Sequence, residues 1–405
     1  MDQSYDLVIV GGGMVGAAAA LSLADTSLRI AVLERQPPSA FDPDQPIDLR
    51  VSALSPASIS LLERLNVWQQ IKSWRACPYK RMRVWELNED ADGLEGLAAR
   101  RCATEFTAAE SGLPELGFIV ENRLIQRALL DALALQDNVD LITDAVTSID
   151  YSPSSTLIEL DSQKTLVARL VVAADGGQSV VRSAAAMGVH QWDYDQMAMV
   201  MNVTTQLPQQ DITWQQFTPR GPLALLPLEG ANASLVWYES PETIQKLMAM
   251  DTQTLMSEVE AHFPNRLGGL KSVEGRACFP LRRLHAQQYV KEGVVLLGDA
   301  AHQINPLAGQ GVNLGFQDVD AFSEIIHDAL IKGERVGDLH VLKRYESKRK
   351  RANLLMMQTM DALYRVFSNQ KAPLKLARNL LLGAVGAAKP IRVKALRVAS
   401  GLDRL

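Results

Sequence analysis

The chain has 405 residues, more than the roughly 250–300 residues that one hydrophobic core supports, so several domains are expected. Its apolar fraction of 47% and charged fraction of 21% are typical of a soluble globular protein. A net charge of −5 gives no electrostatic reason to expect nucleic-acid binding. Three cysteines without a CxxC pair, and six histidines without HxxxH or HExxH spacing, argue against disulfides and a metal site and favour the reducing cytoplasm.

The first predicted element is a buried strand, YDLVIV, followed by a glycine-rich turn and a helix. Residues 7–24 carry no charge, but the acidic start MDQSYD and three consecutive glycines argue against a signal peptide or a membrane span. The stretch RIAVLE predicts a second strand that ends in Glu34, whose carboxylate can accept hydrogen bonds from a ribose. Arg35 follows it and is expected at the same site.

Strand, GxGxxG turn, helix and second strand together form the βαβ fingerprint of dinucleotide binding. Gly11 permits the tight turn, Gly13 lets the backbone approach a pyrophosphate, and Gly16 lets helix and strand pack closely. The helix is predicted from Ala17 to Ala24, and its start offers unpaired N–H groups and a positive dipole end to phosphate. Met14 and Val15, just before it, are expected to contact the cofactor.

Two later stretches identify the dinucleotide. LVVAADGGQSVVR (170–182) predicts a strand ending at Asp175 and Gly176, and VVLLGDAAHQINPLAGQGVNLGFQD (294–318) a strand ending at Gly298 and Asp299. With GxGxxG, these DG and GD motifs resemble, in the same order, the fingerprints of the flavoprotein aromatic hydroxylases, which include para-hydroxybenzoate hydroxylase. The resemblance implies that the cofactor is FAD.

The resemblance also implies roles for single residues. Asp299 binds a ribityl hydroxyl, although a helix N-cap is the alternative, and Asp175 supports the cofactor domain. A loop and a helix start lie beside the isoalloxazine, where the positive helix end stabilises the reduced ring. The residues that it places there are Pro306, Gly309, Gly311, Val312 and Asn313.

Two further contacts follow from the same resemblance. DLRVSAL (48–54) matches a segment whose arginine, here Arg50, contacts the phosphate or ribose region; a surface salt bridge is the alternative. VENRLIQRALLDAL (120–133) matches a helix start that touches the ribityl chain, with Asn122 as first choice and Arg123 as second.

The scattered motifs predict an α/β fold: a Rossmann-like FAD-binding domain of the para-hydroxybenzoate hydroxylase type, an interleaved antiparallel-sheet substrate domain and a helical C-terminus. The expected boundaries are 1–75, 112–182 and 276–333 for the FAD-binding domain, 76–111 and 183–275 for the substrate domain, and 334–405 for the helical region. Strands are predicted at 80–87, 197–204, 213–217, 222–228 and 234–238, and a helical stretch at 241–262.

In the substrate domain, TWQQFTPRGP, ASLVWYESP and HFPNRLG resemble the ubiquinone-biosynthesis hydroxylases, most of all those acting on 2-polyprenyl-3-methyl-6-methoxy-1,4-benzoquinol. The resemblance implies an FAD-dependent monooxygenase that hydroxylates a prenylated quinol ring through a flavin C4a-hydroperoxide, with O2 as co-substrate and NAD(P)H or another reductant as electron donor. Another ring position, a soluble phenol, or a non-catalytic prenyl-binding protein on the same fold remain as alternatives.

An apolar substrate pocket is expected in this domain, although ordinary core positions of the sheet are the alternative. Only Arg220 is a candidate for binding a carboxylate there. The candidate lining residues are Trp214, Phe217, Pro222, Leu225, Pro227, Trp237, Tyr238, Phe279 and Pro280.

The last segment, 371–405, is basic and interleaved with apolar residues. Asp403 is its one acid, against Lys371, Lys375, Arg378, Lys389, Arg392, Lys394, Arg397 and Arg404. Such a segment can lie among anionic lipid headgroups, so peripheral contact with the inner face of the cytoplasmic membrane, or with other ubiquinone-biosynthesis enzymes, is expected. Packing on its own protein or on a second subunit is the alternative.

Overall fold

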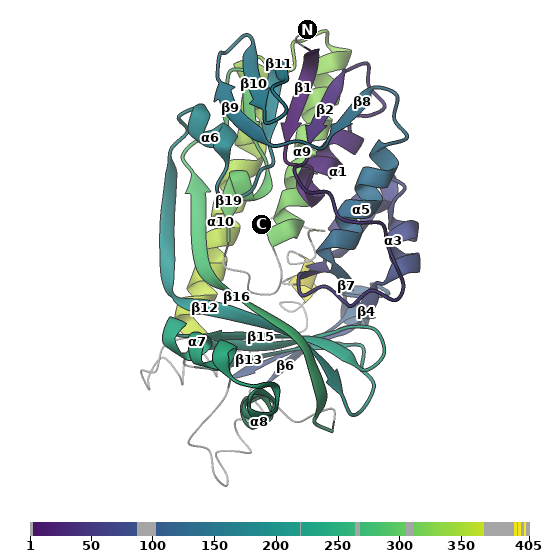
Figure 1. Cartoon of the computed structure of the whole chain (residues 1–405), viewed down its shortest axis with the longest axis vertical. Helices are drawn as coiled ribbons and strands as arrows, with labels where there is room; N and C mark the ends of the chain where they lie inside the picture. The colour runs from purple at the N-terminus through teal and green to yellow at the C-terminus, as the bar shows by residue number, and fades with distance from the viewer. Residues whose placement is uncertain are drawn as a thin grey trace.

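The computed structural model describes residues 3–86, 103–218, 220–263, 268–304 and 311–367, with positions 393, 394, 396, 397 and 401 near the C-terminus. Figure 1 shows two layered halves, each built on a large sheet, with two long strands running between them. In the described part of the chain, no helix is both long and apolar enough to cross a membrane.

The first half contains a mostly parallel sheet. Its parallel strands, in spatial order, are β18 (Val294–Leu296), β11 (Thr165–Ala173), β1 (Gln3–Val10), β2 (Ile30–Leu33) and β8 (Val139–Ile142). Antiparallel β17 (Val290–Lys291), β10 (Thr156–Leu160) and β9 (Val146–Asp150) extend it. The central strands are buried apolar runs, as parallel strands covered on both faces should be.

Three helices matter most for the site in this half. They are α1 (Met14–Leu21), α5 (Asn122–Leu133) and α9 (Gly311–Ile331), and α1 packs against both others. The predicted helix at 17–24 therefore begins three residues earlier, directly after the glycine turn. The other helices here are α2 (Pro56–Arg64), α3 (Trp68–Trp74), α6 (Val180–Ala184) and α10 (Leu339–Phe367).

The second half contains the second large sheet. Its spatial order is β19 (His302–Gln303), β16 (Leu270–Ala286), β12 (Val189–Thr205), β15 (Asn232–Glu239), β14 (Gly221–Pro227), β13 (Ile212–Thr218), β5 (Arg81–Glu86) and β6 (Thr104–Thr107). All five predicted strands are present. The sheet is antiparallel except that β13 and β5 run parallel.

The predicted helical stretch at 241–262 is two helices, α7 (Pro241–Ala249) and α8 (Thr252–His262). The break lies at Met250 and Asp251 because the Asp251 carboxylate accepts a 2.9 Å hydrogen bond from the Thr254 N–H and caps α8. Both helices cover one face of the second sheet.

A small sheet of β3 (Val51–Leu54), β7 (Gly117–Glu121) and β4 (Cys77–Tyr79) lies between the halves. Ala53 and Ile119 of this sheet pack against Leu226 of β14 and against Leu228, which directly follows that strand. The domain boundaries stay a prediction: β16 runs across the one expected at residue 276.

A buried polar network joins the GD motif to α9 and α10. The Asp318 carboxylate, which is fully buried, accepts hydrogen bonds from the Gly298 N–H (3.1 Å) and the Arg349 guanidinium (2.7 Å) and lies 2.6 Å from His302 Nε2. Asn353 donates to the same carboxylate at 3.0 Å. Burial alone would raise the pKa of Asp318, but His302 and Arg349 hold it well below its ordinary value.

We predict that Asp318→Ala lowers the free energy of unfolding by about 3–5 kcal/mol near pH 7, because it strands the buried Arg349 charge. Asp320→Ala, on the same helix, removes a surface ion pair with Arg64 and should cost below about 1 kcal/mol. Since the folded pKa of Asp318 is depressed, the difference between native and Asp318→Ala protein should shrink as pH falls below about 4. Urea unfolding at several pH values measures this; equal losses for both variants would contradict it.

Candidate cofactor and substrate site

The carboxyl ends of the parallel strands meet along one edge of the first sheet. The Gly11 N–H donates to the Leu33 carbonyl, and the Leu297 N–H to the Ala173 carbonyl, each at 2.9 Å. Strands β2, β1, β11 and β18 therefore end side by side. The predicted residues that this edge brings together are Gly11, Glu34, Asp175 and Asp299.

The glycine turn is shaped by close backbone approach. Gly11 has a φ of +99°, and an added Cβ there would lie 2.4 Å from the Ala174 carbonyl oxygen. At Gly16 an added Cβ would lie 1.9 Å from the Gly11 carbonyl oxygen. An added Cβ at Gly13 meets no described atom within 4 Å. Gly11 and Gly16 are thus needed for packing, whereas Gly13 faces open space.

Helix α1 is locked to the GD motif and α9 through Val15. Added Cβ atoms at Gly298 and Gly315 would lie 3.2 and 2.6 Å from the Val15 side chain. Met14, in the same turn, packs partly buried against the main core. The first turn of α1, the GD motif and the first turns of α9 therefore form one tightly packed unit.

Glu34 directly follows β2 and is held by hydrogen bonds. Its carboxylate accepts from the Gln36 N–H at 2.9 Å and from Gln126 Nε2 at 3.2 Å. Gln126, which the sequence did not single out, also donates to the Gly12 carbonyl at 2.9 Å, so it ties the glycine turn to Glu34. The sequence could have indicated Gln126 through its position one helical turn after Asn122, on the same face of α5. Arg35 is exposed beside this site.

Asn122 and Arg50 lie next to each other. The Asn122 N–H donates to the Arg50 carbonyl at 2.9 Å, and its side-chain oxygen accepts from Ser52 Oγ at 2.7 Å. Arg123 instead makes a 2.7 Å ion pair with Glu121, whose buried carboxylate also faces Arg75 at 3.1 Å. Both side chains are thus engaged within the protein, and the choice of Asn122 before Arg123 as a cofactor contact stays a prediction.

Asp299 lies three residues after the end of β18, and the residue is exposed to solvent. Partial burial of its carboxyl raises its pKa, while His302, Gln303 and Arg50 oppose the rise, so the Arg50 charge lies near this carboxyl. The N-cap position of the short 3₁₀ turn Gly298–Ala300 is Leu297, so Asp299 is not a helix N-cap.

Hydrogen bonds of Arg182 join the DG motif to the GD motif. Asp175 Oδ2 accepts from the Val180 N–H at 2.7 Å, and burial raises the pKa of this carboxyl. Its Oδ1 is buried and has no hydrogen-bond partner in the described structure. Arg182 donates to the Gly177 and Ala300 carbonyls at 2.7 and 2.9 Å and so joins the two motifs.

The first residues of α9 differ in their surroundings: Gly311 faces open space, whereas Val312 and Asn313 contact the protein. An added Cβ at Gly311 meets no described atom within 4 Å, and Val312 packs against the main core. The buried Asn313 side chain donates to the Ala53 carbonyl (2.8 Å) and accepts from the Ser55 N–H (2.9 Å), so it fixes the β3–α2 junction and leaves the helix start to offer backbone groups. Pro306 and Gly309 lie outside the described residues.

An apolar pocket of about 140 Å³ lies between the small sheet and the second large sheet. Four of the predicted residues, Trp214, Pro222, Tyr238 and Phe279, line it. The described lining residues are Val51, Ala53, Tyr79, Met82, Val200, Thr213, Trp214, Gln215, Pro222, Ala224, Leu226, Val236, Tyr238 and Phe279. Ala53 connects the pocket to Asn313 at the start of α9.

Leu225 and Trp237 lie away from this pocket, in the core that was the stated alternative. Side chains alternate between the two faces of a strand, so Leu225 lies on the same face of β14 as Leu223. Leu223 pairs with Trp237, so Leu225 and Trp237 share a face of the sheet that points away from the pocket. Trp237 packs against Phe263 with ring centroids 5.5 Å apart, in the core beneath α7 and α8, and Leu225 contacts the same core. Phe217, Pro227 and Pro280 are also not among the described residues that line the pocket.

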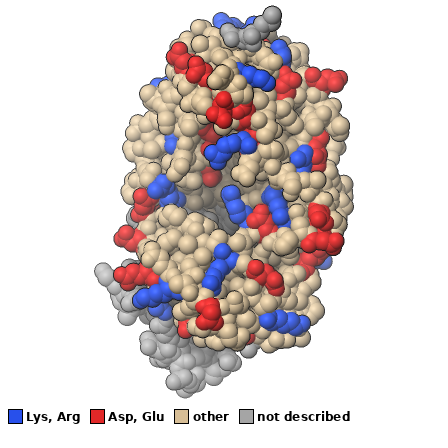
Figure 2. Space-filling model, in the orientation of Figure 1, with Lys and Arg blue, Asp and Glu red and all other residues tan. Residues whose placement is uncertain are grey.

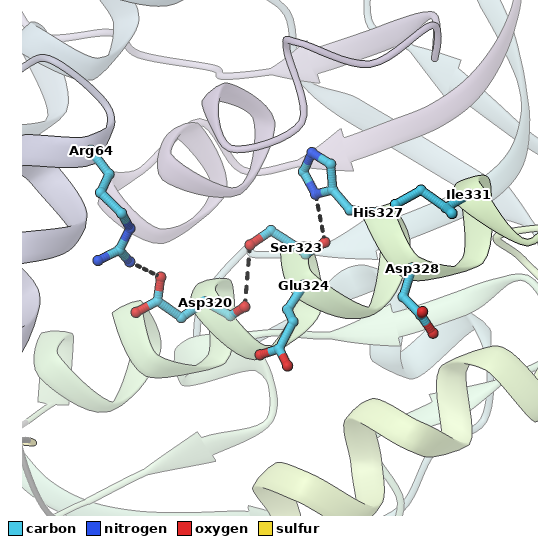
Figure 3. A pocket seen from close by; sticks show the side chains of 7 residues that line it. All are labelled: Arg64, Asp320, Ser323, Glu324, His327, Asp328 and Ile331. Carbon is cyan, nitrogen blue, oxygen red and sulfur yellow. Dashed lines mark hydrogen bonds and ion pairs between the residues drawn. The ribbon is translucent and has the colours of Figure 1, made fainter.

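A second concave surface is a poor candidate for the cofactor site. Figure 3 shows a groove along the outer face of α9 in which acidic side chains predominate, a poor match for an anionic dinucleotide. Its lining residues are Arg64, Asp320, Ser323, Glu324, His327, Asp328 and Ile331. Figure 2 instead shows a central hollow on one face with several Lys and Arg side chains around it. No group of three or more potential metal ligands occurs within the described ranges.

The residues present fit FAD. Gly13 and Gly311 leave open space where a pyrophosphate and a ring would pass, and Glu34 and Asp299 place carboxylates at hydroxyl-binding positions. The unsatisfied Asp175 Oδ1 is a further acceptor at this edge. The positive end of α1 faces the Gly13 opening.

Comparisons with known proteins agree with this geometry. A family model described as an FAD binding domain matches residues 4–360. The chain is 43% identical over 402 residues to 3-demethoxyubiquinol 3-hydroxylase of Escherichia coli (strain K12), covering 99% of this chain and 100% of that protein. It is 34% identical to ubiquinone hydroxylase UbiL of Rhodospirillum rubrum, covering 100% and 91%. Its fold resembles p-nitrophenol 4-monooxygenase PnpA of Pseudomonas putida with a TM-score of 0.80 at 18% identity, covering 100% and 99%.

The fold, the three cofactor motifs and the family match define an FAD-dependent monooxygenase. The chain belongs to the family of ubiquinone-biosynthesis hydroxylases. The fold class and the family expected from the sequence are confirmed.

We predict that Gly13→Val folds normally but weakens FAD binding by roughly tenfold or more, about 1.4 kcal/mol, because the new side chain fills only the cofactor's space. Gly16→Ala should instead destabilise the fold, since its Cβ overlaps the Gly11 carbonyl. Circular dichroism and flavin titration separate the two effects. Unchanged FAD affinity in Gly13→Val would show that the pyrophosphate does not pass over Gly13.

We also predict that Asp299→Ala weakens FAD binding by about 1–3 kcal/mol, because a ribityl hydroxyl loses its acceptor. Asp299→Asn keeps one acceptor oxygen and should lose less. Flavin fluorescence titration of the two apoproteins measures both losses. Full flavin occupancy in Asp299→Ala at limiting FAD would rule out the assigned role.

Proposed function

We propose that this protein hydroxylates the ring of a polyprenylated benzoquinol, a ubiquinone precursor, using FAD, O2 and electrons from NAD(P)H or another reductant. The observation that carries the proposal is the uncharged pocket next to the start of α9. The names of the relatives in Escherichia coli and Rhodospirillum rubrum support the same substrate class.

The pocket suits an uncharged aromatic ring. None of its described lining residues is charged, and most are aliphatic or aromatic. A benzoate carboxylate would need a cationic partner there, because burying it unpaired is costly. Arg220, the candidate clamp, is 3.2 Å from the buried Glu239 carboxylate and is therefore already paired.

When bound, FAD supplies the redox chemistry with O2 that inserts one oxygen atom into an electron-rich ring. The chain's own residues position and shield that chemistry. Glu34, Asp299 and the starts of α1 and α9 would hold the cofactor, and Asn313 fixes Ala53 of the pocket wall at the same helix start. Val51, Leu226 and Val236 line the pocket with apolar surface that excludes water from the ring.

A prenyl chain also needs a way out of a pocket of only about 140 Å³. Phe279 lines the pocket and is 39% exposed, so the pocket reaches the surface beside an apolar ring. An isoprenoid tail leaving along this side would stay in contact with apolar surface.

The expected result with purified holoenzyme, NAD(P)H and O2 is a product one oxygen atom heavier from a short-chain prenylated quinol, and none from 4-hydroxybenzoate. The ring carbon that reacts is read from the product by mass spectrometry and NMR. Conversion of 4-hydroxybenzoate or of a soluble phenol in preference to the quinol would overturn the proposed substrate class.

We further propose that the basic segment 371–405 brings the enzyme to anionic lipid or to a membrane-bound partner enzyme, so that a bilayer-resident quinol can enter. Most of this segment lies outside the described residues. Two described positions lie against the protein: Leu396 is buried with Ala108 and Leu116, and an added Cβ at Gly401 would lie 2.8 Å from Ala57. The basic residues from Lys371 to Arg392 are therefore the ones proposed to meet lipid.

Replacing Lys371, Lys375, Arg378, Lys389 and Arg392 with glutamine should leave FAD binding intact and reduce sedimentation with anionic liposomes. The loss should approach about 1 kcal/mol per well-placed charge and should shrink in added salt. This variant keeps Leu396 in place, which deletion of the whole segment would not. Vesicles of neutral lipid are the control, and native protein that ignores anionic liposomes at low salt would refute direct lipid docking.

A further inference from the structure

Tyr79 occupies a junction between the pocket and two apolar clusters. It ends β4 in the small sheet and lines the pocket. It packs against the cluster around Ala53 and Ile119 and against the cluster of Ala108, Leu116 and Leu396. Its position is therefore fixed by two sets of packing contacts.

The hydroxyl of Tyr79 is unused by the protein. No hydrogen bond from it to another residue occurs in the described part of the chain. Burial raises the pKa of this phenol to about 12, so the group stays protonated and able to donate at neutral pH. Its oxygen is not among the fully buried side-chain atoms without a partner in the described structure, so it is accessible and open to a partner supplied by a ligand.

The backbone of the small sheet limits the positions that the Tyr79 hydroxyl can take. An added Cβ at Gly117 would lie 2.9 Å from Tyr79 Oη and 2.2 Å from the Leu54 carbonyl oxygen, so the backbone of β7 closes that side. The Tyr79 carbonyl accepts from the Leu116 N–H at 2.9 Å, which fixes the backbone as well.

The pocket has polar groups on two opposed walls. Tyr79 belongs to the small sheet, whereas Thr213, Gln215 and Tyr238 belong to the large one. Ala53, on the Tyr79 wall, has its carbonyl bound by Asn313 at the start of α9. A ring oxygen bound by Tyr79 is thereby positioned relative to the helix start that would hold the isoalloxazine.

We propose that the Tyr79 hydroxyl donates a hydrogen bond to a ring oxygen of the bound quinol, and that this bond selects which ring carbon is turned toward the cofactor. The inference rests on the proposed function and adds the residue that orients the substrate. It explains how a pocket without charge can distinguish positions on a ring whose substituents are mostly apolar.

The test compares native holoenzyme with Tyr79→Phe, which keeps the ring and removes one oxygen atom. Dissociation constants are measured by calorimetry under anaerobic, non-turnover conditions for a short-chain prenylated quinol and for the prenylated benzene without ring oxygens. Tyr79→Phe should weaken binding of the quinol by roughly 3- to 10-fold and leave binding of the benzene unchanged. Tyr151→Phe, whose hydroxyl bonds the Glu292 carbonyl away from the pocket, is the matched control and should change neither.

In turnover, Tyr79→Phe should raise the fraction of reductant lost as hydrogen peroxide or yield a second hydroxylated isomer. Equal weakening of both ligands would assign Tyr79 to packing alone and overturn the proposal, as would unchanged quinol affinity with an unchanged product. If native enzyme does not hydroxylate the quinol but the selective loss of quinol affinity is found, the proposed function fails and the hydrogen bond stands.

Discussion

The buried carboxylate of Asp318 is the interaction on which the cofactor site depends. A charge this deep is stable only when fully paired, and here it is shared among the Gly298 N–H, His302, Arg349 and Asn353. These partners come from the GD motif, the strand after it and α10. The partners of the Asp318 carboxylate thus fix the position of the GD motif relative to α9 and α10. Val15, which packs against Gly298, fixes the GD motif relative to the glycine turn as well.

The cofactor edge of the first sheet is joined to the pocket by a contact to the backbone. Asn313 binds the Ala53 carbonyl at the end of the small sheet, and this sheet forms one wall of the pocket. The opposite wall is the larger sheet, whose outer face is covered by α7 and α8. Cofactor edge and pocket are therefore held together by short contacts near β3, although their residues come from distant parts of the chain.

Much of this was predictable because the signals are local. The glycine spacing, the positions of Glu34 and Asp299 shortly after β2 and β18, and the strands of the second sheet follow from short patterns of residues. The face of β15 was not predictable, because both of its faces are buried and the alternation that normally identifies the inner face is missing. Gln126 and Tyr79 gain their roles only from what lies opposite them in the fold.

The FAD site is assembled from pieces that lie between Gly11 and Asn313, and Leu396 packs on the same cluster as Tyr79. During translation the first sheet can begin to form early, but the cofactor cannot be enclosed until α9 has left the ribosome. A chain that stops before this helix would leave the apolar surfaces of α1 and α2 uncovered and would hold no flavin. Cofactor retention therefore marks a chain that has reached α9.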